Sequence, residues 1–148
     1  MDYLYQDKTD RIIRAFYKVY NTLGYGFLER VYHNALLIEL RKEGFKCDSQ
    51  LPIKVYYDSY QVGDYNADII VDDCIILELK AMESICEDHE YQLINYLKAT
   101  NIELGLLLNF GKVPAFKRIL FTNDRKKHYK KENTEKMNTE KMNTDDTD

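Results

Sequence analysis

Apolar residues recur every three to four positions over two segments near the beginning of the chain, residues 5–23 and residues 28–43. This spacing places the apolar side chains along one face of a helix. A glycine follows each segment, at Gly24 and Gly44, and glycine commonly marks the end of a helix. The pattern therefore predicts two amphipathic helices.

Further along, the pattern changes to short apolar runs separated by turn residues. Strands are predicted at residues 51–57, 64–71 and 74–81, with a turn cluster at 58–63, followed by a helix at 86–101 and two closing strands at 103–111 and 115–121. The order of helix, helix, three strands, helix and two strands predicts an α/β fold in which helices flank a central mixed β-sheet.

The third predicted strand carries charges among its apolar residues. In the run IILELKA, Glu78 and Lys80 interrupt a series of isoleucines and leucines. Burying a charge is costly unless it is paired or bound to an ion. Because side chains alternate across a strand, Glu78 and Lys80 share one face and lie about 6–7 Å apart. They are candidates for a functional site or for a salt bridge.

Asp68, on the preceding strand, can join this charged group. If the hairpin pairs Ile70 with Ile76, then Asp68 falls opposite Glu78. This register requires an odd loop or a bulge, such as a loop of residues 72–74, because a two-residue turn would shift Asp68 out of line. Two opposed carboxylates repel each other and raise each other's pKa unless a cation lies between them.

A divalent cation would resolve this repulsion. Mg²⁺ and Mn²⁺ take carboxylate and carbonyl oxygens, lower the pKa of a bound water and hold a phosphate oxygen. Lys80 beside such an ion could position the water or stabilise charge on the phosphate, which is the chemistry of phosphodiester hydrolysis. The alternative is a salt-bridge set of Asp68, Lys80 and Glu78 at an exposed strand end, and the Glu-x-Lys pattern alone favours this alternative.

Three motifs occur in a fixed order along the chain. Asp68 followed by residues 78–80 (ELK) resembles the PD-(D/E)XK nuclease superfamily, with Ala67 at the position of the motif's proline. Residues 92–96 (QLINY) resemble the Q-x-x-x-Y motif of its RecB-like and exonuclease branches. Residues 26–32 (GFLERVY) resemble the G-x-x-E-x-x-Y signature of a small bacterial family in that superfamily, the GxxExxY proteins. The joint order of these motifs is specific.

The resemblance covers residues 12–121 and implies a restriction-endonuclease-like αβββαβ core. It implies that Asp68 and Glu78 bind Mg²⁺ or Mn²⁺ together with the Leu79 carbonyl. It also implies that Lys80 assists the nucleophilic water.

The resemblance assigns three further residues to the site. Glu29 would complete the acidic group, and Gln92 and Tyr96 would orient metal-bound water or the substrate strand. Taken alone, Glu29 is a carboxylate favourable to a helix N-terminus, Gln92 is a solvated polar residue and Tyr96 is a core residue. His33 lies one turn from Glu29 and could join the site, although a surface histidine is the simpler interpretation.

Composition narrows the class of protein. The length of 148 residues fits one domain and a tail, which we place at residues 1–122 and 123–148. No apolar run is long enough to span a bilayer, and the first ten residues do not form a signal peptide. The cysteines Cys47, Cys74 and Cys86 lack metal-ligand spacing, which predicts reduced thiols in a cytoplasmic protein.

Near its start the tail carries a basic block, RKKHYKK at residues 125–131, and residues 133–148 read NTEKMNTEKMNTDDTD. The segment after Lys131 has no aromatic or β-branched apolar residue to offset its ordering entropy, which predicts disorder. The basic block could contact nucleic-acid phosphates, although a solvated charged helix end is the simpler explanation.

The net charge of −4 bears on the partner, since acidic residues already outnumber basic ones in residues 1–122. This balance argues against a simple phosphate-binding surface, but it is compatible with a site that recruits a divalent cation. The sequence thus predicts a metal-dependent nuclease, with DNA expected ahead of RNA. The alternative is a non-cleaving nuclease-fold module that binds nucleic acid or a protein partner. The complete motif set favours catalysis, whereas the acidic surface and small size favour the module.

Overall fold

The computed structural model describes residues 3–126, and the predicted disorder after Lys131 lies outside this range. In chain order the elements are α1 (Gln6–Leu23), α2 (Glu29–Lys42), β1 (Cys47–Tyr57), β2 (Tyr60–Val71), β3 (Ile75–Lys80), α3 (Glu87–Lys98), β4 (Leu104–Asn109), β5 (Ala115–Leu120) and the short 3-10 helix η1 (Asn123–Arg125).

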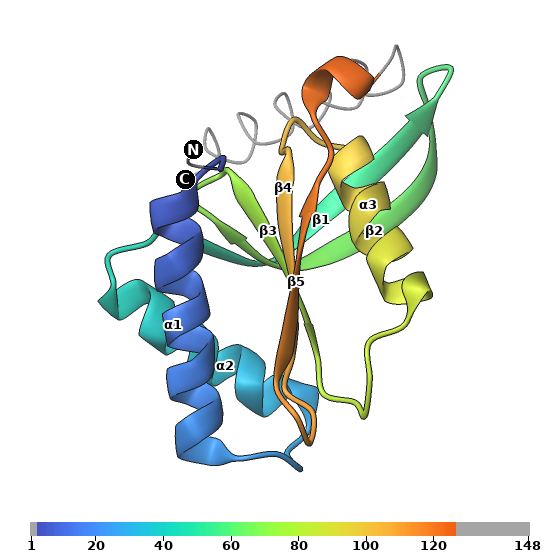
Figure 1. Ribbon diagram of the computed structural model, residues 1–148. Coiled ribbons are helices and arrows are strands. Elements are labelled where there is room, and N and C mark those ends of the chain that lie inside the picture. Colours follow the sequence, from blue (N-terminus) through green and yellow to red (C-terminus); the bar gives the residue numbers. More distant parts are fainter. Residues whose placement is uncertain (1–2, 127–148) are drawn as a thin grey trace, which may run out of the picture.

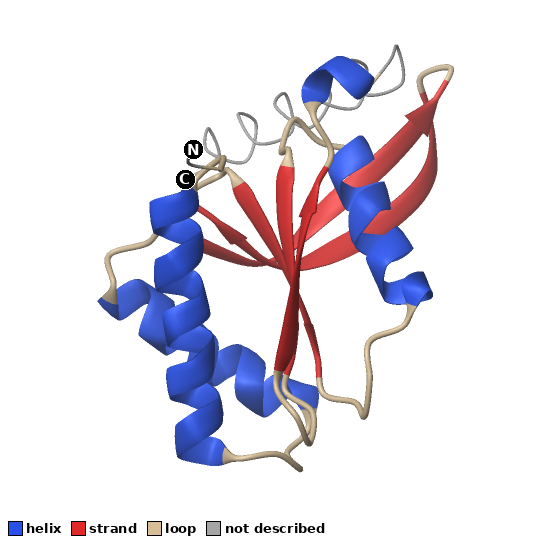
Figure 2. Cartoon of the chain, viewed as in Figure 1, coloured by secondary structure: helices blue, strands red, loops and turns tan. Residues whose placement is uncertain are grey.

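The five strands form one mixed sheet in the order β1-β2-β3-β4-β5. The pairs β1–β2, β2–β3 and β4–β5 are antiparallel, and β3–β4 is parallel. Helix α3 is the crossover that a parallel pair requires. Helices α1 and α2 cover one face of the sheet and α3 covers the other (Figures 1 and 2). The predicted α/β fold with an αβββαβ core is confirmed.

Each face of the sheet packs against its own hydrophobic cluster. The cluster under α1 and α2 is built around Ile12, Phe16, Tyr32, Leu36, Ile69, Leu77 and Phe110. The cluster under α3 is built around Ile53, Ala67, Ile70, Ile76, Leu93, Tyr96 and Leu107. Because both faces are covered, all six residues of β4 are buried, as is typical of a strand in the middle of an α/β sheet.

The β2–β3 hairpin has the register that the sequence predicts. Ile70 pairs with Ile76, and the loop between the strands consists of residues 72–74. Asp72 and Asp73 adopt left-handed backbone conformations, with φ of 51° and 58°. Aspartate tolerates this conformation better than most residues do, which makes the three-residue loop accessible to this sequence.

The β1–β2 hairpin is longer than the sequence predicts. The expected turn cluster at residues 58–63 reduces to Asp58 and Ser59, and β2 already begins at Tyr60. Both turn residues are left-handed, with φ of 50° and 67°, and such two-residue turns match the natural twist of paired strands. The extended hairpin projects beyond the rest of the sheet (Figure 1).

The alternation of faces along β2 breaks at Asp68. Ala67 packs into the cluster under α3, whereas Ile69 packs into the cluster under α1 and α2. Residues two apart on a regular strand share a face. The neighbouring position on β1 is also irregular, because Gln50 has a φ of 54° and lies between the paired residues Ser49 and Leu51. The sheet is therefore kinked where Asp68 stands.

The first four residues of the predicted tail, residues 123–126, contact the domain. The Asn123 backbone N–H donates to the Glu103 carboxylate at 2.7 Å, and the Lys126 ammonium donates to the Ile102 carbonyl at 2.6 Å. These contacts hold η1 against the end of β4. The division into a domain and a tail remains a prediction.

Two general findings complete the fold. The cysteines Cys47 and Cys74 are half-buried, Cys86 is exposed, and all three are free. Among the helices within residues 3–126, none has the length and apolar character needed to cross a membrane.

Candidate active site

Asp68 and Glu78 meet at the point where the β2–β3 ladder ends. The last paired residues before this point are Ile69 and Leu77. The Asp68 backbone N–H donates to Glu78 Oε1 at 3.2 Å, and the Leu79 backbone N–H donates to Asp68 Oδ2 at 2.8 Å. Each carboxylate thus binds the backbone of the opposite strand. The structure brings the two acids together, as the register predicts.

Glu78 is a buried acid beside a second acid. Only 3% of its surface is exposed. Burial, and then the negative charge of Asp68, raise the pKa of Glu78 from 4.5 to about 8. The hydrogen bond from the Asp68 N–H and the charge of Lys80 lower the pKa of Glu78, but they do not offset burial. The site therefore favours a cation at this position, because a cation would stabilise the ionised pair.

Lys80 is half-buried and contacts α3 rather than the carboxylates. Its ammonium donates to Gln92 Oε1 at 3.4 Å. Within the described part of the chain it forms no ion pair shorter than 4.0 Å with Asp68 or Glu78. The salt-bridge explanation of the Glu-x-Lys pattern requires such ion pairs, so the structure does not support it.

Gln92 and Tyr96 continue this contact one turn along α3. Gln92 Nε2 donates to the Tyr96 hydroxyl oxygen at 3.0 Å, which gives a chain from Lys80 through Gln92 to Tyr96. Tyr96 is 3% exposed and also packs in the cluster under α3. Burial, and then the charge of Glu78, raise the pKa of Tyr96 to about 12. The hydroxyl therefore keeps its proton at neutral pH.

Glu29 is the first residue of α2 and is exposed. Loss of solvation, and then the negative charge of Asp68, raise the pKa of Glu29. The charges of Lys80 and His33 act in the opposite direction. Glu29 thus shares an electrostatic environment with Asp68, Lys80 and His33, although it comes from a different element.

The segment before α2 explains the spacing of residues 26–32. Gly26 has a φ of 110°, a conformation that residues with a side chain rarely adopt. The fully buried Tyr32 donates its hydroxyl hydrogen to the Gly24 carbonyl at 2.6 Å and accepts the Phe27 N–H at 3.2 Å. Tyr32 therefore anchors the loop that leads to Glu29.

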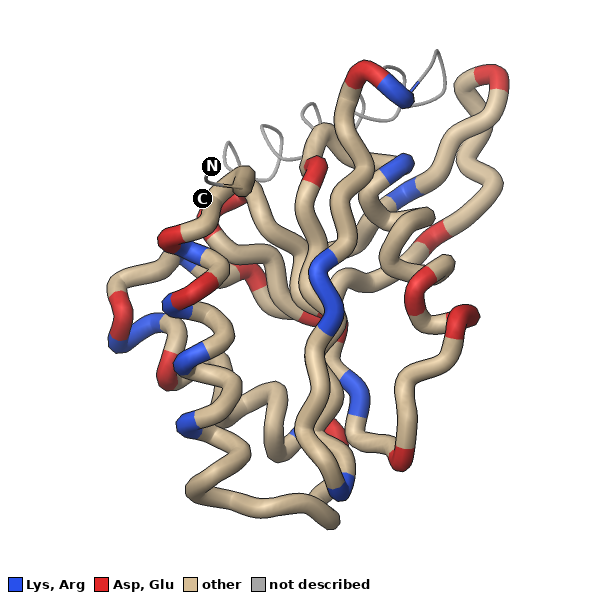
Figure 3. Tube along the Cα trace, in the orientation of Figure 1, with Lys and Arg blue, Asp and Glu red and all other residues tan. Residues whose placement is uncertain are grey.

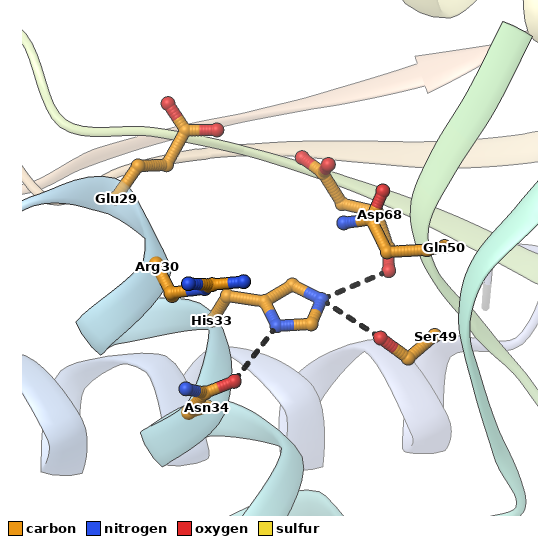
Figure 4. Close-up of a pocket in the computed structure, with 7 residues that line it drawn as sticks. All are labelled: Glu29, Arg30, His33, Asn34, Ser49, Gln50 and Asp68. Atoms are coloured by element: carbon orange, nitrogen blue, oxygen red, sulfur yellow. Dashed lines mark hydrogen bonds between the residues drawn. The ribbon is translucent and has the colours of Figure 1, made fainter.

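A pocket of about 350 Å³ lies between α2 and the kinked part of β1 and β2 (Figure 4). Its lining consists of Glu29, Arg30, His33, Asn34, Ser49, Gln50 and Asp68. His33 Nε2 lies 3.1 Å from the Asp68 carbonyl oxygen and 3.2 Å from Ser49 Oγ. A carbonyl oxygen only accepts, so Nε2 carries a hydrogen. His33 is half-buried and lines this pocket beside Asp68, and its participation in the site stays a prediction.

Sequence reasoning missed the other polar residues of the pocket. Ser49 and Gln50 precede the predicted start of the first strand, so no register was assigned to them. The observed pairs Ser49–Ile69 and Leu51–Ala67 place Gln50 beside Asp68. An extension of the first predicted strand by four residues would have revealed this neighbourhood.

The donor atoms at the acid pair fit a hard divalent cation. Among residues 3–126, no three or more His, Cys, Asp or Glu side chains come together as a metal cluster. Two carboxylates are present, and a backbone carbonyl can add a third oxygen. The Lys80 carbonyl accepts the Phe110 N–H and so points toward β4, whereas the Leu79 N–H points toward Asp68. Successive carbonyls of a strand point to opposite sides, so the Leu79 carbonyl faces the side of Asp68.

A model of the PD-(D/E)XK nuclease superfamily matches residues 6–119 of the chain. The protein belongs to this superfamily. The match spans all the helices and strands that surround the acid pair, and it supports a nuclease-like function in general. Nucleases of the PD-(D/E)XK superfamily typically depend on a divalent metal, which agrees with the oxygen donors found here. No curated protein and no solved structure matches the chain significantly.

Proposed function

We propose that this PD-(D/E)XK protein is a metal-dependent nuclease that hydrolyses phosphodiester bonds, and that it belongs to the GxxExxY proteins within the superfamily. One observation carries the proposal. Glu78 is buried against Asp68, and neither acid is neutralised by an ion pair with the adjacent Lys80. A purely structural site would be expected to pair such an acid with a cationic side chain, because a buried acid beside a second acid ionises only at a high cost when no cation is near.

Asp68, Glu78 and the Leu79 carbonyl would hold Mg²⁺ or Mn²⁺. When bound, the ion would lower the pKa of a water molecule and reduce the negative charge on the phosphate. The Asp68 and Glu78 side chains each accept a backbone N–H of the opposite strand, and these bonds fix the separation of the two acids. The site is thereby preorganised, which reduces the cost of assembling it during the reaction.

Lys80 would orient the attacking water or stabilise the charge that develops on the phosphate. Gln92 holds the Lys80 ammonium, and Tyr96 in turn holds Gln92, so α3 sets the position of the ammonium group of Lys80. Glu29 would complete the acidic site from α2. DNA is the substrate that we expect ahead of RNA, and the cytoplasm is the expected location.

A second candidate function is a module that binds nucleic acid or a protein partner without cleaving. The distribution of charge favours it. Lysine and arginine are scattered among aspartate and glutamate over the trace and form no continuous basic stripe in the view of Figure 3. The net charge is −4, so tight retention of a polyanion would depend on a bound cation or on a partner.

The Lys80→Ala variant separates these candidates. Cleavage of single-stranded and duplex DNA and RNA would be measured with Mg²⁺ or Mn²⁺ and with EDTA. We expect the variant to lose ~10²–10³-fold in rate, because Lys80 would act mainly on the transition state. Its affinity for nucleic acid should change much less. Lys98→Ala, at the exposed far end of α3, is the matched control and should cleave at the wild-type rate.

Undiminished metal-dependent cleavage by Lys80→Ala would refute the assigned role of this lysine. A wild type that binds nucleic acid but cleaves no substrate with either metal would favour the binding module. In that case Lys80→Ala should weaken binding modestly and lower the salt dependence by about one unit of slope.

A further inference from the structure

Arg30 is a cation without a partner at the mouth of the pocket beside Asp68. It follows Glu29 at the start of α2 and is exposed. Its guanidinium makes no hydrogen bond or ion pair with any residue between positions 3 and 126. In Figure 4 it lies over His33, on the opposite side of the pocket from the carboxyl group of Glu29. Five N–H donors are thus free to bind a ligand.

The pocket has two chemically different sides. The carboxyl groups of Glu29 and Asp68 lie along one side (Figure 4). The side chains of Arg30, His33 and Ser49 lie on the other, and Asn34 and Gln50 complete a lining without apolar side chains. Arg30 is the only lysine or arginine in this lining. A ligand that fits must carry an anionic group toward Arg30 and approach the acid pair with another part.

The phosphodiester chain of a nucleic acid has this property, because each nucleotide carries its own phosphate. The volume of about 350 Å³ is at the lower end of the range for small-molecule pockets, which suits about one nucleotide and not a base pair. A nucleotide that enters such a pocket must be unpaired. Asp68 lines both the pocket and the proposed metal site, so the nucleotide in the pocket would adjoin the scissile bond.

We propose that this pocket binds the nucleotide next to the scissile bond of an unpaired strand, and that Arg30 holds its phosphate. The assignment rests on the proposed function, since nucleic acid as the ligand comes from it. Arg30 suits the role because its planar guanidinium can hold two phosphate oxygens at once. His33 shapes the pocket floor through its contacts with the Asp68 carbonyl and the Ser49 hydroxyl.

The test compares Arg30→Ala with Arg14→Ala, which removes another exposed arginine without a partner among the described residues, on α1 and outside the pocket. The probe is a short fluorescent single-stranded DNA, with the duplex of the same sequence as comparison. Affinity is measured by anisotropy over a range of salt in EDTA, where metal-dependent cleavage cannot occur. Melting temperatures show whether both variants are folded.

We expect Arg30→Ala to bind the single strand about tenfold more weakly or worse, as for the loss of a charged hydrogen bond. The slope of log affinity against log salt should fall by about 0.7, the value for one phosphate contact on a single strand. Arg14→Ala should match the wild type. The wild type should prefer the single strand over the duplex, and Arg30→Ala should lose this preference.

The proposal would be overturned if Arg30→Ala bound the single strand with the same affinity and salt slope as Arg14→Ala. This holds even if the wild type cleaves nucleic acid and Lys80→Ala does not. A specific loss in Arg30→Ala would uphold the pocket even if the wild type cleaves nothing, and the nuclease proposal would then fail alone. Arg30→Lys should restore the salt slope but not the full affinity, because lysine provides the charge without the planar pair of donors.

Discussion

Replacement of Glu78 by glutamine isolates the electrostatic cost of the acid pair. Glutamine keeps the Oε1 atom that accepts the Asp68 N–H, fits the same volume and removes the ionisable group. In the wild type, burial raises the pKa of Glu78 from 4.5 to about 8 in the folded state. The folded protein therefore binds this proton more tightly than the unfolded chain does, and stability falls as the pH rises between these two values.

The magnitude follows from 1.36 kcal/mol per pKa unit. The full interval between 4.5 and about 8 corresponds to roughly 5 kcal/mol, a figure of order-of-magnitude quality. The penalty is absent below pH 4.5, grows with pH and is complete above about pH 8. Between pH 5 and pH 9 the wild type should thus lose about 4 kcal/mol relative to Glu78→Gln. This is a large share of the ~5–15 kcal/mol that stabilises most domains.

The assay is urea unfolding in EDTA at pH 5, 7 and 9, with the free energy of unfolding compared between the wild type and Glu78→Gln. The comparison removes the contributions of other groups that titrate in both proteins. Glu83→Gln removes the same charge from an exposed position and should follow the wild-type curve. Mg²⁺ at pH 9 should restore stability to the wild type by mass action and have little effect on Glu78→Gln.

The same pH dependence in the wild type and in Glu78→Gln would refute this argument, because Glu78 would then ionise in the folded protein as readily as in the unfolded chain. Equal Mg²⁺ stabilisation of both proteins would place the ion away from Glu78. Either result would also remove the main support for the metal site.

Two further predictions concern the residues that hold the site in place. Tyr32→Phe should cost about 1–3 kcal/mol in urea unfolding, because the Gly24 carbonyl and the Phe27 N–H lose the hydroxyl that they share in partly buried hydrogen bonds. The variant should also cleave more slowly, because Glu29 would be held less firmly. Wild-type stability and rate would contradict the anchoring role. Gly111→Ala should lower the melting temperature clearly, because the new Cβ would lie 2.1 Å from the Met82 carbonyl oxygen. Gly63→Ala should be tolerated, because its nearest neighbour would be the Val55 side chain at 3.3 Å. Equal effects of the two substitutions would contradict the close approach at Gly111.

The order of the elements could be predicted because hydrophobic spacing is a local property. Apolar residues three to four apart mark α1 and α2, and glycines close both segments. The start of β1 could not be predicted in this way, since residues 47–50 (CDSQ) show no alternation. They join the sheet because Cys47 and Ser49 pair with residues on β2, which is a long-range effect. Helix η1 likewise depends on a distant partner, Glu103.

The pairing of Asp68 with Glu78 could be predicted from the sequence for a different reason. The even positions of β2 and β3 carry Asp68, Glu78 and Lys80, so a register with an odd loop brings the acids together, and the structure has that loop. The contacts of Lys80 could not be predicted from the sequence, because an ion pair with the neighbouring acids and a hydrogen bond to Gln92 are equally compatible with it. Only the packing of α3 against the sheet decides between them.

The kink at Asp68 connects the fold to the proposed chemistry. On a regular strand Asp68 would project from the same face as Ile70, and the Leu79 N–H would bind a backbone carbonyl of β2. The break in alternation instead lets the Asp68 carboxylate itself accept the Leu79 N–H. The acid is thereby drawn toward Glu78 and, at the same time, remains part of the pocket wall beside Glu29. One irregular residue thus joins the acid pair to the pocket, which is why a change that restores regular pairing at Asp68 should disrupt both.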